Sequence, residues 1–398
     1  DDPVNVTHVA GLFRSAGMVE QAIPLYQQAI DLAPTAPQYV EYLGEYLHSL
    51  NRTDDALLKF GQMAAGERRT TENLSRLSQV LANFGYTEQA LAAMTAAIEL
   101  TPQFLDYVRL ATLLREAKRY EECLQQLGLA EQNVGNDEER RQLQQERIQC
   151  YQAADTLPQQ IAEMQQQLTA ASLSDTTEQQ WQFLGLLQQT AGRLRDAAKS
   201  LQQAVRLNPG STESWTLAAD IMEKAGLLAD ASEAHKQLAS MDRRTQVEHL
   251  KRVAELEQQL GRSAAALQAA KDVITAAPGN PEASRFYADM CFRLGQPEQA
   301  IEALRQAVRS NPGDREALQT LAAVLADEFR TEEATELYWR AFEKTEDLNA
   351  RVAIVRSLAG LYLRTDQFPQ LVTRLQSLAS DSADHRDMLQ CLSNAYQT

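Results

Sequence analysis

The residue types that most often carry catalysis or bind metals are scattered along this chain. No pair of histidines has the His-Glu-x-x-His spacing of a zinc site, and no pair of cysteines forms Cys-x-x-Cys. These residues are His8, His48, His235, His249, His385, Cys123, Cys150, Cys291 and Cys391. The sequence therefore predicts no metal site, and packing explains Cys123 and Cys291 better than redox or metal chemistry.

Sequence motifs for nucleotide binding and nucleophilic catalysis are also absent. The chain has neither the Gly-x-x-x-x-Gly-Lys loop that cradles phosphates nor the Gly-x-Ser-x-Gly turn of hydrolases. Charged outer faces of helices account for the frequent Asp and Glu residues. We expect no catalytic, cofactor-binding or metal-binding residues, and we predict that the chain is not an enzyme and uses no cofactor.

A pattern of residues recurs about every 34 positions along the chain. This pattern predicts the helices that would position any functional side chain. A small residue recurs as Ala22, Ala56, Ala90, Ala197, Ala231, Ala266, Ala300 and Ala334. Glycine stands five residues before six of these alanines, at Gly17, Gly85, Gly192, Gly226, Gly261 and Gly295. Proline closes many units, at Pro34, Pro102, Pro209, Pro278 and Pro312. A fixed period of this length is typical of a solenoid of stacked repeats.

Each recurring residue has a physical role in a pair of helices. Alanine permits the close approach of two helix backbones, and glycine ends the first helix in a left-handed conformation that a Cβ would penalise. Proline stops the second helix because it cannot continue the hydrogen-bond pattern.

At these positions the chain resembles the tetratricopeptide repeat (TPR) family. The clearest match is formed by Trp181, Leu184, Gly185, Ala197, Leu201, Ala204 and Pro209. Units are predicted to begin near residues 3, 37, 71, 104, 142, 178, 212, 247, 281, 315, 352 and 386. The resemblance, about eleven and a half repeats, implies an all-α fold: a right-handed α-solenoid (superhelix) of stacked helix-turn-helix repeats.

We predict three parts along the chain. Residues 1–137 hold TPR repeats one to four, and residues 178–398 hold repeats six to eleven plus the first helix of a truncated twelfth. Residues 138–177 between them form a degenerate TPR-like helical hairpin that lacks the small residue and the closing proline. It has a longer loop at residues 172–177. Evolutionary drift and a hinge between two rigid blocks are both open as explanations of this hairpin.

Composition limits the partners. The formal net charge of −16 and the isoelectric point near 4.9 argue against nucleic acid as the main partner, since binding phosphates requires surplus Lys and Arg. No apolar run approaches the length of about 18 residues that a membrane span needs, so we expect no membrane insertion.

The ends of the chain suggest a piece of a longer protein. The sequence starts at Asp1 without Met and stops after half a unit, which carries Leu389, Leu392 and Tyr396. This open apolar edge would support end-to-end self-association. Localisation is open: the cysteines are compatible with a reducing cytoplasm, and a removed signal peptide would place the chain in the periplasm or outside the cell.

The resemblance implies that the first helices line a concave groove that holds a peptide or a partner's helix. Family members that clamp a chaperone's terminal carboxylate place Asn or an equivalent donor at slots that Gly11, Glu45 and Gln79 occupy here. Chaperone docking is therefore disfavoured.

A partner-binding patch is predicted in the C-terminal part of this groove. Its candidate residues are Arg285, Asp289, Phe292, Arg293, Arg356, Leu363 and Arg364. Guanidinium groups beside an exposed aromatic ring would suit an acidic segment that carries an apolar anchor. The alternative is that Asp289 and Asp327 pair with these arginines within the chain.

Two functional classes follow from the resemblance. The first is a non-catalytic scaffold or adaptor that binds a protein or peptide segment in its groove. The second is the TPR region of a larger envelope or exopolysaccharide-export protein, or of a multidomain enzyme, whose active part lies outside this segment.

Overall fold

The computed structural model describes residues 2–172, 175–278, 280–381 and 385–397, and their regular structure is entirely helical. The first helices of the repeats are α1 (Pro3–Ser15), α3 (Pro37–Ser49), α5 (Thr71–Asn83), α7 (Phe104–Glu116), α9 (Asp137–Ala153), α11 (Glu178–Thr190), α13 (Thr212–Lys224), α15 (Gln246–Gln259), α17 (Pro281–Arg293), α19 (Arg315–Asp327), α21 (Leu348–Arg364) and α23 (His385–Gln397). The second helices are α2 (Val19–Leu32), α4 (Thr53–Gln62), α6 (Thr87–Leu100), α8 (Tyr120–Glu131), α10 (Leu157–Ala170), α12 (Leu194–Leu207), α14 (Leu228–Met241), α16 (Ser263–Ala276), α18 (Pro297–Ser310), α20 (Thr331–Glu343) and α22 (Phe368–Asp381). A 3-10 turn, η1 (Gly66–Arg68), follows α4.

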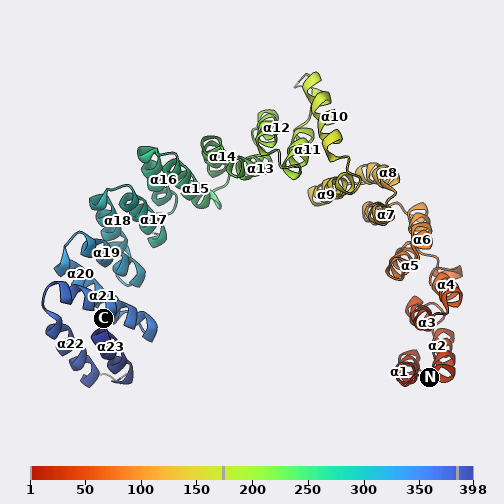
Figure 1. The fold of residues 1–398 in the computed structure, drawn as a ribbon, viewed down its shortest axis with the longest axis horizontal. Helices are drawn as coiled ribbons and strands as arrows, with labels where there is room; N and C mark the ends of the chain where they lie inside the picture. The colour runs from red at the N-terminus through yellow and green to blue at the C-terminus, as the bar shows by residue number, and fades with distance from the viewer. Residues whose placement is uncertain (1, 173–174, 279, 382–384, 398) are drawn as a thin grey trace. The chain divides into compact units, whose positions relative to one another are not determined.

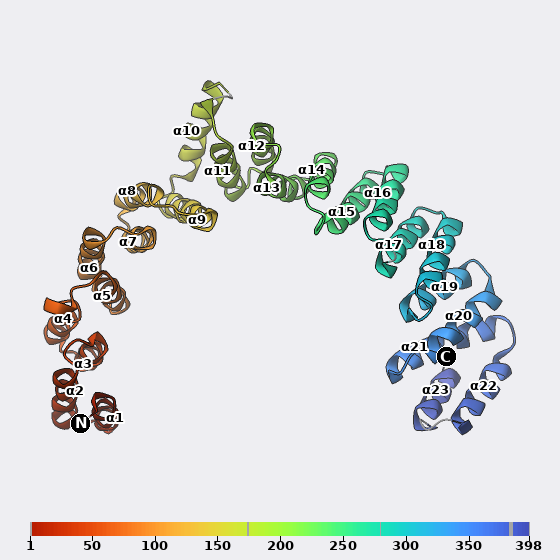
Figure 2. The ribbon, with the colours of Figure 1, turned by 180° about the vertical axis from the view of Figure 1, so that it is seen from behind.

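The helices form two compact units, which are residues 1–172 with Leu186–Gly192 and residues 173–185 with Arg193–Thr398. Consecutive helices pack against each other from α1 to α10 and from α12 to α23, so that within each unit helix pairs stack on helix pairs (Figures 1 and 2). First helices of neighbouring repeats also touch, as α7 does with α9 and α17 with α19. The predicted all-α fold of stacked helix-turn-helix repeats is confirmed.

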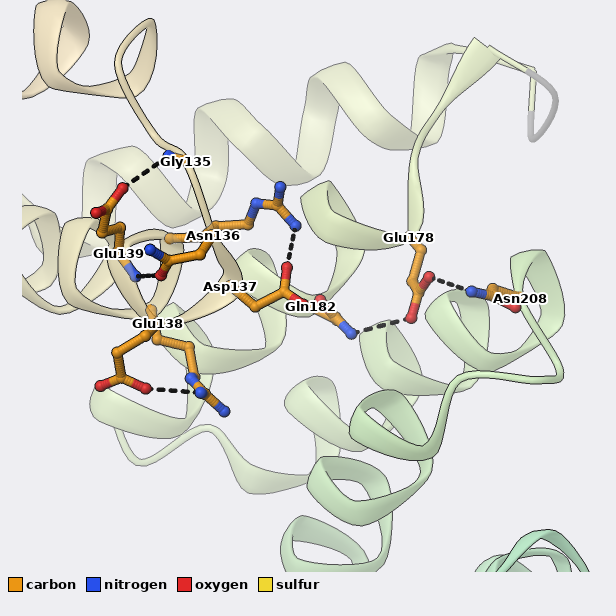
Figure 3. Close-up of polar contacts among 10 residues, drawn as sticks. Gly135, Asn136, Asp137, Glu138, Glu139, Glu178, Gln182 and Asn208 are labelled. Carbon is orange, nitrogen blue, oxygen red and sulfur yellow. Dashed lines mark hydrogen bonds and ion pairs between the residues drawn. The ribbon is translucent and has the colours of Figure 1, made fainter. Parts of the chain in front are cut away.

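Most first helices begin within a residue of the predicted starts, but α9 and α21 begin about one turn earlier. The reason is helix capping. Asn136 accepts a hydrogen bond from the backbone N–H of Glu139, whose carboxylate accepts from the N–H of Gly135 (Figure 3). Asp347 caps α21 by accepting from the N–H of Ala350. Each helix therefore has 17 residues instead of the usual 13 or 14.

The turn inside each repeat has a left-handed residue at one fixed position. All six predicted glycines have positive φ, between 71° and 80°. The other five repeats use non-glycine residues at this position with φ between 57° and 61°, namely Asn51, Lys118, Asp155, Phe329 and Asp366. The left-handed conformation at this position is thus common to the repeats, and glycine is the residue that adopts it with the least strain.

The closing prolines also act as predicted. The second helices before them end two residues earlier, at Leu32, Leu100, Leu207, Ala276 and Ser310. The division into residues 1–137, 138–177 and 178–398, including the hinge, stays a prediction. Part of its loop, residues 173 and 174, lies outside the described residues.

The last described helix leaves an apolar edge. Tyr396 of α23 is 63% exposed, and its ring meets the edge of Phe368 with centroids 5.8 Å apart. The side chain of Leu389 lies outside the described part of the chain. End-to-end self-association through this edge stays a prediction.

Candidate partner-binding surface

The seven candidate residues lie on two first helices of the second unit. Helix α17 carries four of them and α21 carries three, and α19 is the first helix of the repeat between them. Each helix ends in an apolar residue followed by arginine, Phe292-Arg293 on α17 and Leu363-Arg364 on α21. Phe292 is 42% exposed and Leu363 is 50% exposed, although both are large apolar side chains.

Two of the arginines form ion pairs within the chain. The guanidinium of Arg285 pairs with Glu316 and lies 3.9 Å from the Asp314 carboxylate, both at the start of α19. Arg293 pairs with Asp289 one turn earlier on α17, at 2.8 Å. The predicted pairing of Asp289 is therefore present. Among the described residues, no ion pair joins Asp327 to an arginine.

The other two arginines make single hydrogen bonds to neighbouring first helices. Arg356 donates to the Asn394 side chain of α23 at 3.1 Å, and Arg364 donates to the Ala326 carbonyl of α19 at 2.9 Å. A guanidinium has five N–H donors, so each arginine keeps donors for an additional acceptor.

These contacts belong to a wider set of polar links between consecutive first helices. In the first unit, Arg76 pairs with Glu41 at 2.6 Å and Arg115 pairs with Glu146 at 3.4 Å. In the second unit, Arg252 pairs with Glu223. The sequence signal for these links is a pair of opposite charges about one repeat apart, which a search for short motifs does not find.

A partly buried polar centre links α11 to the following repeat. The carboxylate of Glu178 accepts hydrogen bonds from Asn208 at 2.7 Å and from Gln182 at 3.1 Å (Figure 3). It also accepts from the hydroxyl of Ser214 at 2.5 Å. Burial raises the pKa of Glu178, but hydrogen bonds from Ser211, Ser214 and Asn208 outweigh it and lower the pKa below its usual value. The centre therefore favours an ionised carboxylate.

Two family models described as tetratricopeptide repeat match the chain, one over residues 12–71 and 184–239 and the other over residues 258–325. These parts of the chain are tetratricopeptide repeats. TPR proteins are generally protein-interaction scaffolds and typically non-catalytic. No curated protein matches the sequence.

Several solved structures resemble the chain over part or nearly all of its length. The MamA protein is 20% identical, with 42% of this chain and 91% of that chain covered and a TM-score of 0.32. YrrB, described as a TPR protein with an unusual peptide-binding site, is 13% identical, with 46% and 93% covered and a TM-score of 0.31. Yeast Tom70 is 12% identical, with 99% and 95% covered and a TM-score of 0.33.

A hollow in the first unit is lined by first helices of the TPR repeats. Helices α5, α7 and α9 contribute Gln79, Asn83, Val108, Thr112 and Glu146 to its walls. Across the described ranges, no three His, Cys, Asp or Glu residues gather as a metal site. The helices there are also too short or too polar to span a bilayer.

The structure brings together two histidines that look unrelated in the sequence. Nδ1 of His235 lies 3.1 Å from Nδ1 of His249, and Nε2 of His235 lies 2.8 Å from the Glu223 carboxylate. Because a carboxylate only accepts, Nε2 of His235 carries a hydrogen. When His235 is neutral, its Nδ1 accepts a hydrogen bond from Nδ1–H of His249. Arg252 binds the same Glu223 carboxylate, so four side chains join α13, α14 and α15.

This cluster should make the second unit less stable in mild acid. Burial, and then the charge of His235, lowers the pKa of His249, while Glu248 and Asp242 oppose the shift. Above the pKa of the unfolded histidine, about 6.5, both states are neutral and the stability is at its maximum. As the pH falls below it, the unfolded chain binds a proton more readily than the folded chain, and the free energy of unfolding decreases. The hydrogen bond from Arg252 lowers the pKa of Glu223, so its contribution is lost only in stronger acid, below about pH 4.3.

We therefore expect thermal unfolding of the wild type to shift to lower temperature between about pH 7 and about pH 5.5, where His249 of the unfolded chain takes up a proton more readily than His249 of the folded chain. The variant His249→Gln should show a flatter profile over this range. His8→Gln, which changes an exposed histidine in the first unit, is the control. Equal pH slopes in the wild type and His249→Gln would contradict the assignment.

Proposed function

We propose that this TPR protein is a scaffold that binds an acidic partner segment on the first helices α17, α19 and α21. The observation that supports this proposal is the exposure of Phe292 and Leu363, each directly followed by an arginine. An apolar anchor of the partner would contact one of these side chains. The partner's carboxylates would meet Arg293 and Arg364.

The intramolecular pairs leave room for such a partner. Both members of the Arg293–Asp289 pair are more than half exposed, at 56% and 51%. Exposed pairs of this kind contribute only about 0–1 kcal/mol, so a well-placed partner carboxylate competes at little cost. Arg364 uses one donor on the Ala326 carbonyl and keeps others. We expect Arg285 to stay in place, since two carboxylates of α19 hold it.

The test uses a synthetic peptide of Asp and Glu residues around one central Leu, titrated into the full chain. We expect saturable binding that weakens at high salt. The double variant Arg293→Glu with Arg364→Glu should weaken binding at least about tenfold, or about 1.4 kcal/mol, with unchanged helical circular dichroism.

The matched control carries the same charge change on second helices, Arg195→Glu on α12 with Arg309→Glu on α18. It should bind the peptide as the wild type does. Equal loss in both double variants would show a general charge effect and contradict the proposed surface. Absence of wild-type binding would contradict the proposed ligand.

A further inference from the structure

We propose that Cys123 and Cys150 form a redox-active thiol pair, which closes to a disulfide between α8 and α9 when the protein meets a small-molecule disulfide. This modification site is independent of the proposed peptide-binding surface, because it lies in the other unit.

The two thiols lie together in one buried core. Cys123 on α8 is 1% exposed and Cys150 on α9 is 0% exposed, and both belong to the same apolar cluster. Sγ of Cys150 donates to the carbonyl of Tyr120 at 3.6 Å. Tyr120 lies one turn before Cys123, so the Cys150 sulfur rests against the turn of α8 that carries Cys123. Each thiol is also the strongest influence on the pKa of the other, so the two sulfurs are neighbours.

Packing alone does not explain a cysteine at position 150. Cys150 stands five residues before the left-handed Asp155, and other repeats place large aliphatic residues there: Val80, Leu113, Leu187, Ile221, Leu256 and Met290. Cys123 occupies the slot of the recurring alanine, which faces a neighbouring helix. In the fifth repeat, Cys150 therefore replaces a large aliphatic side chain at the position that faces the second thiol, Cys123.

The surroundings make Cys150 the nucleophile of the pair. The hydrogen bond from Cys123 lowers the pKa of Cys150, burial opposes this, and the Arg115 guanidinium lowers it further against the carboxylate of Glu146. The pKa of Cys123 is raised, first by the same hydrogen bond and then by burial. Arg115 pairs with Glu146 through Nη2, but its buried Nε–H has no hydrogen-bond partner, so it keeps a donor for a thiolate nearby.

The reaction is a thiol–disulfide exchange in two steps. The Cys150 thiolate attacks one sulfur of the small-molecule disulfide, forms a mixed disulfide and releases the first small thiolate. Cys123 then loses its proton and attacks Sγ of Cys150, which releases the second small thiolate. One disulfide of the oxidant is reduced to two thiols while one disulfide forms in the protein. Because α9 packs on α7 and α8 but only lightly on α10, local opening of α9 gives the oxidant access.

The test incubates the full chain with glutathione disulfide at neutral pH, followed by alkylation and peptide mapping without reduction. We expect a linked Cys123–Cys150 peptide that has lost two hydrogen atoms, in at least tenfold excess over any oxidised form of Cys291 or Cys391. Cys291 is the internal control, since it is equally buried but has Tyr287, not a cysteine, as the neighbouring group that affects its pKa.

Two variants separate the steps. Cys123→Ala, which restores the residue usual at that slot, should leave Cys150 as a stable mixed disulfide with glutathione. Cys150→Ser should leave Cys123 reduced. The proposal is overturned if Cys291 reacts as fast as Cys150, if the wild type accumulates only mixed disulfides, or if no linked peptide forms while the urea-unfolded chain is oxidised readily.

Discussion

Replacing Gly44 with alanine should destabilise the first unit by about 1–3 kcal/mol. A Cβ at Gly44 would lie 2.5 Å from Cε1 and 2.6 Å from Cδ1 of Phe60, well inside van der Waals contact. The ring cannot move away cheaply, because Phe60 is fully buried and stacks on Phe84 with centroids 5.4 Å apart. Helices α3 and α4 would have to separate, which would weaken the second repeat and its contacts on both sides.

The control for this prediction is Gly128→Ala in the interior of α8. A Cβ there would meet nothing within 4 Å, so alanine should be neutral or stabilise by up to about 1 kcal/mol through its helix propensity. Urea unfolding followed by circular dichroism compares the two variants, and hydrogen exchange identifies the repeats that open, since a solenoid need not unfold in one step. A Gly44→Ala protein as stable as the wild type would contradict the close packing of α3 on α4.

Replacing Glu257 with alanine should destabilise the second unit by about 2–3 kcal/mol. The side chain of Glu257 is 2% exposed and accepts from the buried hydroxyl of Ser232 at 2.6 Å, from Lys236 at 3.1 Å and from Arg262 at 3.4 Å. The variant would leave a cavity and a buried hydroxyl without its acceptor. Lys236 and Arg262 are about half exposed and would return to water, which limits the loss.

Two variants test the origin of this effect. Glu257→Gln keeps an acceptor for Ser232 and should cost less than Glu257→Ala. Glu255→Ala removes a carboxylate that is 41% exposed on the same helix and should cost less than about 1 kcal/mol. Chemical unfolding at neutral pH measures all three, and equal stability of Glu257→Ala and Glu255→Ala would contradict a structural role for the buried carboxylate.

The repeat period alone predicts most of the fold. Alanine, glycine and proline recur at fixed positions of the repeat and so locate its turns. Each residue type meets a steric requirement that is the same in every repeat. The period fails at α9 and α21, where Asn136 and Asp347 add a turn before the apolar pattern begins. Local capping residues set the first residue of these two helices, and the repeat period does not predict them.

The candidate surface was predictable only in part. Helix periodicity indicated which arginines stand on first helices, but the position of Arg364 against the Ala326 carbonyl depends on how α21 packs on α19. The histidine and cysteine pairs were missed because each spans two helices. His235 and His249 come from α14 and α15, and Cys123 and Cys150 come from α8 and α9, so neither pair has a short sequence motif.

Hydrogen exchange of the full chain, with and without the acidic Leu-centred peptide, tests the proposed binding surface most directly. At saturating peptide we predict slower exchange in α17, α19 and α21 and unchanged exchange in α18, α20 and α22. Protection of the second helices instead, or no protection of α17 and α21 despite binding, would contradict the account.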